Sequence, residues 1–353
     1  MGPKGAWYLV RSRNPVDGTH SHHLDEPLAS RLLRQVRSIM AKLLLFFTFV
    51  AEIIGILLFL FVTLGQYGRI MNEVHVRVPA TTANLGPGFD CLGIALQLYN
   101  TTTVWRVDAG DSDEMAREAG NAFFRVADVK PFAFGWKTEG GVPRSRGLGS
   151  SVTVRLGILH GLNELSGRPL DKHSLFRICS DLEGHPDNAA PAAYGGFAVA
   201  PASGPVQCYA VDKSLAFVLL VPSCEILTSE ARRVLPRAVP FGDAVVSAGN
   251  AAAIAAAFAS GNYRKLAGCF DDRLHEPYRE RLMPWIPSVV AAARESGALG
   301  GWLSGSGSCV ACATLVRPEK IANAMLVASG LDECLAAVVR ADNSGVRILK
   351  KRE

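Results

Sequence analysis

The sequence predicts a protein that mixes α-helices with β-strands and is organised as two domains. The chain has 353 residues, which is more than one small core usually serves and suggests about two domains. Segments with strand-like alternation or continuous apolar runs are interleaved with segments of helical periodicity. Residues 201–205, PASGP, contain Pro and Gly and mark the expected boundary between the domains.

The composition excludes some classes of partner. The formal net charge is +5, but many of the basic residues lie before residue 71, and no basic stripe carries interleaved aromatic residues. We therefore expect no nucleic-acid partner. The eight cysteines are scattered without the spacing of a disulfide framework, which favours reduced thiols and a cytoplasmic protein.

Residues 1–70 form an N-terminal extension that we treat apart from the body of the chain. Residues 1–42 are polar and without periodicity, so we expect them to be poorly ordered. Residues 43–64 are almost entirely apolar, with Glu52 near the middle, and reach the roughly 20 residues that a membrane-spanning helix needs. Because basic residues precede this run, a true span would hold the N-terminus in the cytoplasm and the body outside. A wrongly assigned start upstream of Met71, a membrane anchor and a cleaved signal stay open as alternatives.

The body opens with a strand and a polar loop. Residues 74–78, VHVRV, alternate apolar and polar residues as a strand does. Pro and Gly residues then exclude a regular element over residues 81–90, which we interpret as a polar loop. Loops of this kind often carry function. A turn in which Asn84 and Asp90 cap the backbone is the alternative.

A glycine loop is the most informative single stretch. Periodicity predicts a helix over residues 111–129 and a strand over residues 132–138. They lead to residues 143–151, PRSRGLGSS. Gly147 and Gly149 permit backbone torsions that residues with a Cβ resist, so this stretch is predicted to turn sharply between a strand and a helix.

The helix after the glycine loop is predicted from its start signals and its apolar stripe. Ser150 and Ser151 are N-cap candidates, and leucines recur at every third position, at Leu156, Leu159, Leu162 and Leu165. A loop that feeds a helix N-terminus leaves N–H groups unpaired beside the positive end of the helix dipole. This arrangement indicates an anion site, most readily for phosphate. An ordinary loop-to-helix junction stays the alternative.

Residues 183–197, EGHPDNAAPAAYGGF, place an acid, a histidine, a second acid and an amide close together. A glutamate such as Glu183 can ligate Mg²⁺ directly. For His185 and Asp187, mutual hydrogen bonding that shapes the turn is the structural alternative to a role at a substrate. The two glycines near the end of the stretch are expected to allow close strand packing.

The second half of the body adds three further elements. Residues 215–221 are a continuous apolar run suited to a central strand, and residues 249–261 form an Ala-rich helix. A second glycine loop at residues 305–307 precedes a strand. Cys309 and Cys312 form a CxxC, but odd spacing in a strand directs them to opposite faces, and no second pair completes a zinc site.

Four of these stretches occur in the order and approximate spacing of one enzyme family. They are PATTANLGPGFD (79–90), PRSRGLGSS (143–151), EGHPDNAAPAAYGGF (183–197) and LSGSGS (303–308). The chain from Met71 onward resembles the GHMP family of small-molecule kinases, and its first stretch favours the homoserine kinases among them. The resemblance implies an α+β fold with a ribosomal S5 domain 2-like N-terminal domain at residues 71–203 and a ferredoxin-like C-terminal domain at residues 204–353.

The resemblance also implies roles for the motif residues. ATP would be bound by Pro143, Arg144, Ser145, Arg146, Gly147, Leu148, Gly149, Ser150, Ser151, Val152 and Thr153, with Asn121 at the adenine. Mg²⁺ would be held by Glu183 and by the hydroxyl of Ser151 or Ser150. The substrate would be bound by Asn84, Asp90, His185, Asn188, Arg232 and Arg279, of which Asn188, His185 and Arg232 are the catalytic candidates.

The implied activity is transfer of the ATP γ-phosphoryl group to the hydroxyl of L-homoserine, a step towards threonine. Asp90 would hold the substrate ammonium, and Arg232 and Arg279 its carboxylate. Because the loop lacks the lysine of a Walker motif, backbone amides and the helix dipole would cradle the phosphates.

Several alternatives stay open at this point. Another GHMP small-molecule kinase and a non-catalytic nucleotide-binding regulatory member are the rival functions. A membrane partner is expected only if residues 43–64 are translated. The sequence does not decide the oligomeric state, and a homodimer is among the options.

Overall fold

The computed structural model describes residues 40, 73–109 and 113–352. From residue 73 onward, the described residues belong to one compact unit that spans residues 69–353. The expectations for residues 1–70, which include the apolar segment 43–64, lie outside the described residues.

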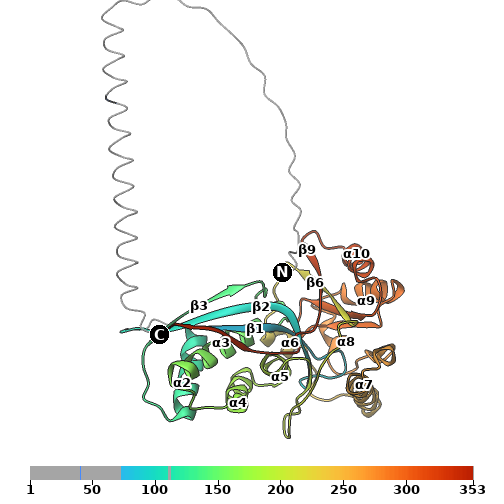
Figure 1. Cartoon of the computed structure of the whole chain (residues 1–353). Helices are drawn as coiled ribbons and strands as arrows, with labels where there is room; N and C mark the ends of the chain where they lie inside the picture. The colour runs from blue at the N-terminus through green and yellow to red at the C-terminus, as the bar shows by residue number, and fades with distance from the viewer. Residues whose placement is uncertain (1–39, 41–72, 110–112, 353) are drawn as a thin grey trace, which may run out of the picture. The chain divides into compact units, whose positions relative to one another are not determined.

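The first sheet of this unit is antiparallel and joins strands from both ends of the body (Figure 1). Its strands are β1 (Glu73–Ala83), β2 (Leu92–Arg106), β3 (Phe134–Gly140), β4 (Phe197–Val199), β5 (Gln207–Tyr209) and β10 (Arg347–Arg352). They follow the order β10-β1-β2-β4-β5, and β3 pairs with β2 as well. The loop predicted from residue 81 begins later than expected, because β1 resumes its pairing with β2 after a bulge at Pro79/Ala80 and continues to Ala83.

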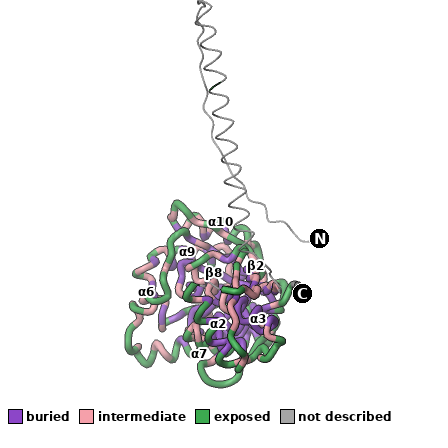
Figure 2. Tube along the Cα trace, turned by 90° about the vertical axis from the view of Figure 1, so that its left-hand side faces the viewer, coloured by how far each residue is buried: buried purple, intermediate pink, exposed green. Residues whose placement is uncertain are grey.

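Four helices build the larger core together with this sheet. They are α2 (Glu114–Ala127), α3 (Ser150–Leu165), α4 (Lys172–Glu183) and α5 (Ala189–Tyr194). The helices α3 and α5 pack against the strands, and α2 and α4 pack against α3. The four leucines of the predicted stripe on α3 are all buried, and buried segments gather around α3 in Figure 2. The helix predicted over residues 111–129 and the strand predicted over residues 132–138 are confirmed as α2 and β3, with shifted bounds.

The second sheet has the strand order β7-β8-β6-β9. Its strands are β6 (Ala216–Pro222), β7 (Gly300–Leu303), β8 (Val310–Thr314) and β9 (Cys334–Val339). β6 is an interior strand and almost fully buried, which confirms the central strand predicted for residues 215–221. Cys309 and Cys312 contribute to two different hydrophobic clusters, as their spacing predicted, and all eight cysteines are free thiols.

The remaining helices surround this second sheet. They are α6 (Thr228–Arg233), α7 (Phe241–Ala259), α8 (Glu276–Arg279), α9 (Ile286–Glu295) and α10 (Pro318–Ser329), with a 3₁₀ turn η1 (Tyr263–Leu266). α7 confirms the Ala-rich helix. Within the described part of the chain it is also the one helix whose length and composition would suffice to cross a membrane, which is weak evidence for a span.

Close contacts tie the end of the chain back to the first sheet. Gly196 lies against Tyr209, where a Cβ would stand 2.3 Å from the carbonyl oxygen, so this glycine allows the predicted close packing. β5 and β10 both follow residue 203 and both pair in the first sheet. The first sheet thus contains strands from both sides of the predicted boundary, and the domain bounds 71–203 and 204–353 stay a prediction.

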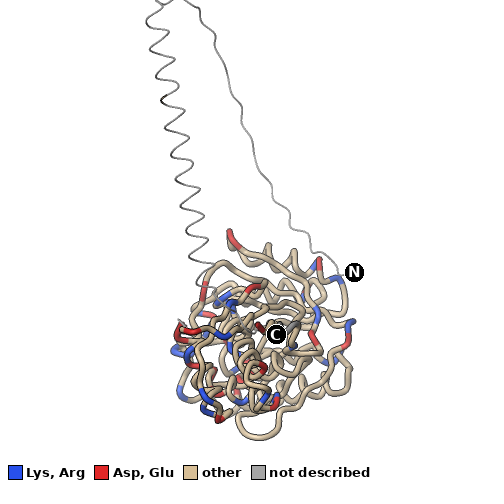
Figure 3. Tube along the Cα trace, turned by 60° about the vertical axis from the view of Figure 1, so that its left-hand side comes forward, with Lys and Arg blue, Asp and Glu red and all other residues tan. Residues whose placement is uncertain are grey.

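Basic and acidic residues are interspersed along the trace of the unit (Figure 3).

Candidate active site

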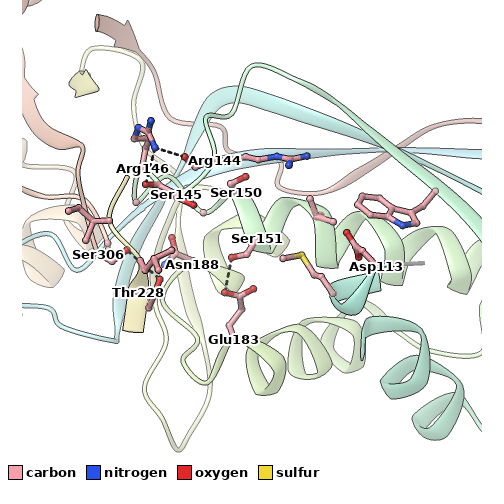
Figure 4. Close-up of a pocket in the computed structure, with 18 residues that line it drawn as sticks. Asp113, Arg144, Ser145, Arg146, Ser150, Ser151, Glu183, Asn188, Thr228 and Ser306 are labelled. Atoms are coloured by element: carbon pink, nitrogen blue, oxygen red, sulfur yellow. Dashed lines mark hydrogen bonds between the residues drawn. The ribbon is translucent and has the colours of Figure 1, made fainter. Parts of the chain in front are cut away.

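A cavity of about 310 Å³ opens where the glycine loop and the start of α3 meet the loop before β8 (Figure 4). Its volume falls in the range of small-molecule sites, roughly 300–1,000 Å³. The lining residues are Asp113, Met115, Trp136, Arg144, Ser145, Arg146, Gly147, Gly149, Ser150, Ser151, Val154, Glu183, Asn188, Ile226, Leu227, Thr228, Gly305 and Ser306. Stretches far apart in the sequence thus build one cavity.

The glycine loop is wedged between β1 and the second glycine loop. Gly147 and Gly149 both have positive φ, at 70° and 66°. A Cβ would stand 1.9 Å from the Ser304 carbonyl oxygen at Gly147, and 2.1 Å from Thr81 Oγ1 at Gly149. Ser304 Oγ also donates a hydrogen bond to the Gly147 carbonyl, at 2.6 Å. Only glycine fits at these two positions, and the second glycine loop lies beside the first.

The start of α3 has no side-chain cap. Its N-cap residue is Gly149, and among the residues that the structure describes no side chain accepts a hydrogen bond from the first turn. The prediction that Ser150 or Ser151 caps the helix is wrong, because both are already helical residues. Their side chains line the cavity instead. First-turn N–H groups without a side-chain partner, together with the positive end of the helix dipole, favour an anion at this point.

A carboxylate and a hydroxyl face each other beside this helix terminus. Ser151 Oγ donates to Glu183 Oε2 at 2.9 Å, as Figure 4 shows. The other oxygen of Glu183 accepts from Arg155 at 2.6 Å, and Arg155 also donates to Glu118 at 3.1 Å. Hard oxygen atoms of this kind suit Mg²⁺, so Glu183 and Ser151 fit a magnesium ion. Arg155, one helical turn beyond Ser151, was missed by the sequence reasoning.

The two arginines of the glycine loop differ in their surroundings. Arg146 Nε donates to the Pro222 carbonyl at 2.8 Å, a second nitrogen donates to the Ser223 carbonyl, and a third forms an ion pair with Glu225 at 3.2 Å. Arg144 is exposed at the cavity. Among the described residues no hydrogen bond or ion pair holds its guanidinium. Arg146 therefore anchors the loop, whereas Arg144 is available to a ligand.

Asn188 connects the cavity to a second group of charged side chains, the acceptor cluster, made of Asp90, His185, Asp187, Arg232 and Arg279. Asp90 accepts two hydrogen bonds from Arg232, at 2.8 and 3.1 Å. His185 Nδ1 donates to Asp187, which realises the structural alternative for that pair. The ligand atoms of Asp90, His185 and Asp187 all lie within 4.8 Å of one another. The loop that carries Asp90, the turn that carries His185 and Asp187, and helix α6 with Arg232 thus come together at the acceptor cluster.

The carboxylates beside His185 raise its pKa. Burial on its own lowers the pKa of this histidine, but the hydrogen bond and charge of Asp187, helped by the charge of Asp90, raise the pKa overall. The nearby guanidinium of Arg232 opposes them. His185 is therefore held in place as a donor towards Asp187.

Arg279 is a buried cation that is held by neutral groups. Its Nε donates to the Ala231 carbonyl at 3.1 Å, and Nη1 donates to the Gly305 carbonyl at 2.9 Å and to His275 Nδ1 at 3.2 Å. Burial, and then the charge of Arg232, lower the pKa of Arg279 to about 10. Burial likewise lowers the pKa of His275 to about 4, so this ring is neutral and accepts. The guanidinium groups of Arg232 and Arg279 are thus close enough for the charge of one to act on the other.

Two asparagines link these loops. Asn84 Nδ2 donates to the Gly305 carbonyl at 3.0 Å, and Asn84 Oδ1 accepts from the backbone of Asp90 at 3.1 Å. Asn188 Oδ1 accepts from Thr81 Oγ1 at 2.7 Å. Both ends of the Asn84 amide are therefore engaged within the protein, and this side chain fixes the loop that presents Asp90.

Comparisons with known proteins agree with this geometry. Residues 113–196 match the GHMP kinases N terminal domain, and residues 251–329 match the GHMP kinases C terminal model. Homoserine kinase of Parasynechococcus marenigrum is 38% identical over 284 residues, which cover 74% of this chain and 90% of that protein. The chain belongs to the homoserine kinases of the GHMP family.

Other relatives of this GHMP kinase extend the match. Homoserine kinase of Caldicellulosiruptor bescii is 33% identical over 296 residues, covering 78% of this chain and 96% of that protein. The crystal structure of homoserine kinase from Cytophaga hutchinsonii has a TM-score of 0.72 and 23% identity, and covers 80% of this chain and 98% of that one. The predicted α+β GHMP kinase fold and the enzyme class, an ATP-dependent small-molecule kinase, are confirmed.

The structure places most of the predicted ATP-binding loop of this kinase at the cavity. Arg144, Ser145, Arg146, Gly147, Gly149, Ser150 and Ser151 line it, whereas Pro143, Leu148, Val152 and Thr153 do not. Leu148 and Val152 are buried in the hydrophobic core, and Thr153 Oγ1 donates to the Ser150 carbonyl at 2.7 Å. Leu148, Val152 and Thr153 therefore hold the loop from the side that faces away from the cavity.

Asn121, predicted for the adenine, is not brought to the cavity. It is exposed about two turns into α2, whereas the residues that line this part of the cavity are Asp113, Met115, Trp136 and Val154. Trp136 sits on β3 and Val154 follows Ser151 on α3, and neither position belongs to a motif of the sequence. The role of Asn121 stays a prediction to which the geometry adds no support.

Proposed function

We propose that this kinase transfers the γ-phosphoryl group of ATP to the side-chain hydroxyl of L-homoserine, forming O-phospho-L-homoserine on the route to threonine. The observation that carries the proposal is that both signs of charge converge beside the phosphate cavity. Arg232 and Arg279 suit a carboxylate, and Asp90 suits an ammonium group. The relatives named homoserine kinase support the same substrate. An alcohol that lacks either charge would leave one of these groups unpaired.

ATP would lie along the cavity with its phosphates at the start of α3. The first-turn N–H groups and the Ser150 hydroxyl would bind phosphate oxygens, and Arg144 would add the positive charge that a Walker lysine supplies elsewhere. The base would point towards Trp136 and Met115, the apolar part of the lining.

Magnesium would be held by Glu183 and Ser151. When bound there, it would neutralise phosphate charge at the reacting end of the nucleotide. Arg155 holds the other oxygen of Glu183 and so orients the carboxylate towards Ser151.

The acceptor hydroxyl would be positioned by Asn188, which lines the cavity, and by His185 of the acceptor cluster. Arg232 and Arg279 would fix the far end of the substrate, and Asn84 would hold the loop that carries Asp90. Phosphoryl transfer depends mainly on positioning and charge neutralisation. These residues therefore account for catalysis without a carboxylate placed as a strong base.

The direct test is turnover by the purified full chain with ATP and Mg²⁺. We expect a much higher kcat/KM for L-homoserine than for mevalonate or shikimate, which lack the ammonium group that Asp90 would bind. Equal turnover of the three alcohols, or none on homoserine, would refute the substrate assignment.

We also propose a cytoplasmic location, since the reaction needs ATP and the cysteines are free thiols. N-terminal sequencing of the native protein tests the alternative of a membrane anchor. A first residue near Met71 removes residues 43–64 from the mature protein, whereas an intact N-terminus in a membrane fraction would refute the proposed location.

A further inference from the structure

An aromatic ring lies at the centre of the proposed carboxylate subsite. Phe89, next to Asp90, stacks on His275 with ring centroids 4.9 Å apart. The guanidinium carbon of Arg232 lies 5.5 Å from the centroid of the Phe89 ring, and that of Arg279 lies 5.2 Å from it. One side chain therefore contacts both arginines and the histidine that accepts from Arg279.

Two guanidinium groups around one ring repel each other. The charge of Arg232 contributes, after burial, to the lowered pKa of Arg279. Arg232 has Asp90 as a counter-charge, but among the described residues no carboxylate forms an ion pair with Arg279. The charges of Asp90 and Asp187 act on Arg279 without direct contact and oppose this lowering of its pKa. The groups that bond Arg279 directly, two backbone carbonyls and His275, are neutral.

The face of an aromatic ring attracts cations without carrying a net charge. A carboxylate in this place would hold the arginines more strongly, but it would also neutralise them and compete with an anionic ligand. The Phe89 ring attracts both arginines without itself competing with an anionic ligand for their N–H groups. Its stacking on the buried, neutral His275 fixes its position in turn, because His275 donates to the Gly86 carbonyl at 2.9 Å.

We propose that Phe89 is a positioning residue that keeps Arg232 and Arg279 together as one subsite for the α-carboxylate of an amino-acid substrate. This role rests on the proposed function and adds to it the device that organises carboxylate recognition. Phe89 acts through the arginines, so it governs substrate affinity and leaves the nucleotide cavity unaffected.

The test replaces the ring without changing its apolar character. Phe89→Leu should raise KM for L-homoserine about tenfold, the order expected for losing two cation–π contacts, with kcat and KM for ATP within about twofold of the wild type. Phe89→Tyr keeps the ring and should restore KM. Phe89→Met retains side-chain length without a ring and should behave like Phe89→Leu, which guards against a folding defect in one variant.

A substrate without the carboxylate separates positioning from a merely structural role. On 3-aminopropan-1-ol, which keeps the hydroxyl and the ammonium group, Phe89→Leu should leave kcat/KM unchanged. Phe132→Leu is the matched control, because it removes another contact between an aromatic ring and an arginine. The guanidinium carbon of Arg106 lies 3.5 Å from the centroid of the Phe132 ring, and neither residue belongs to the acceptor cluster. Phe132→Leu should leave KM for homoserine unchanged.

The outcomes are distinct. An unchanged homoserine KM in Phe89→Leu, or equal losses on homoserine and aminopropanol, would overturn the role of Phe89 while the homoserine kinase activity stands. Absence of wild-type turnover on homoserine would overturn the proposed function and, with it, this inference.

Discussion

The nucleotide cavity and the acceptor cluster hold their polar groups in opposite ways. The cavity offers backbone N–H groups at the start of α3 and an exposed Arg144 that has no partner among the described residues. In the acceptor cluster, charges are already paired, Asp90 with Arg232 and His185 with Asp187. Under the proposed function, nucleotide binding would add contacts, whereas acceptor binding would exchange them.

Under the proposed function, this difference would explain how each region selects its ligand. An exchange is favourable only if the incoming molecule replaces both charges of a pair, because a buried charge left alone is costly. A zwitterionic amino acid satisfies Asp90 and the two arginines together. The nucleotide cavity needs no such match, and we expect it to bind any suitably shaped polyphosphate.

The largest expected effect lies in the nucleotide cavity, at Glu183. Glu183→Gln removes the charge that faces Ser151 and should lower kcat by about 10²–10³-fold, the order found for losing one group that stabilises transition-state charge. Glu118→Gln is the matched control, because Glu118 also bonds Arg155 but lies on the outer side of it. The measurement is steady-state kinetics over a range of Mg²⁺ concentrations. Similar activities of the two variants would contradict the metal-binding role.

The exchange of partners in the acceptor cluster is tested at Asp90. Asp90→Asn should raise KM for homoserine by about 10–100-fold, since hydrogen bonds to charged groups contribute about 1.5–3 kcal/mol, and KM for ATP should not change. Arg232→Met should act on the same KM. Because the two residues bond each other, their effects in the double variant should fall short of additivity. Strictly additive effects would mean that the pair is not exchanged on binding.

A smaller effect separates the two arginines of the glycine loop. Arg144→Met should raise KM for ATP by about fivefold to tenfold, because a hydrogen bond at this exposed position should contribute about 1 kcal/mol, and it should leave the melting temperature unchanged. Arg146→Met should instead lower the melting temperature, because its guanidinium holds the backbone at Pro222 and Ser223. Thermal unfolding and ATP titration of both variants measure the two quantities. The reverse pattern would show that Arg146 is the phosphate ligand.

The sequence predicts the nucleotide region well because its determinants are local. Glycines at Gly147 and Gly149 and the leucine stripe of α3 each follow from short-range geometry, and the structure agrees with them. The N-cap of α3 was mispredicted because the preference for serine at an N-cap selects Ser150, which is already the first residue of the helix. Gly149, with its left-handed backbone, ends the loop instead.

For the acceptor cluster, the sequence predicted which charged residues take part but not which of them contact each other. Its charges come from the loop after β1, the turn after α4, and α6 and α8, and only the tertiary fold shows that Asp90 meets Arg232. Phe89 gave no signal of its own, because an aromatic residue in a loop reads as packing. Arg155 reads as a surface charge on α3 until α4 brings Glu183 to it.

The smallest expected effect concerns Glu276, on the same short helix as Arg279. Burial, with the charges of Asp272 and Glu280, raises the pKa of Glu276 to about 8, although the N–H of Leu303 opposes them. The unfolded chain releases this proton near the ordinary value of about 4.3. Between these values the folded state binds more protons, so this group lowers the free energy of unfolding as pH rises from about 4 to about 8.

Replacing this carboxyl group should remove that pH dependence. Glu276→Gln keeps an oxygen that can accept from Leu303, as Glu276 Oε1 does at 2.7 Å. At pH 8 the variant should melt a few degrees higher than the wild type, roughly the shift for a gain of about 1 kcal/mol in the free energy of unfolding. Near pH 4 the two proteins should melt at the same temperature. Thermal unfolding across this range measures the difference, with Arg144→Met as a control from the nucleotide cavity. If the two melting temperatures differ by the same amount at all pH values, the pKa of Glu276 is not raised by folding. The surroundings of Glu276 would then be more hydrated than their packing indicates.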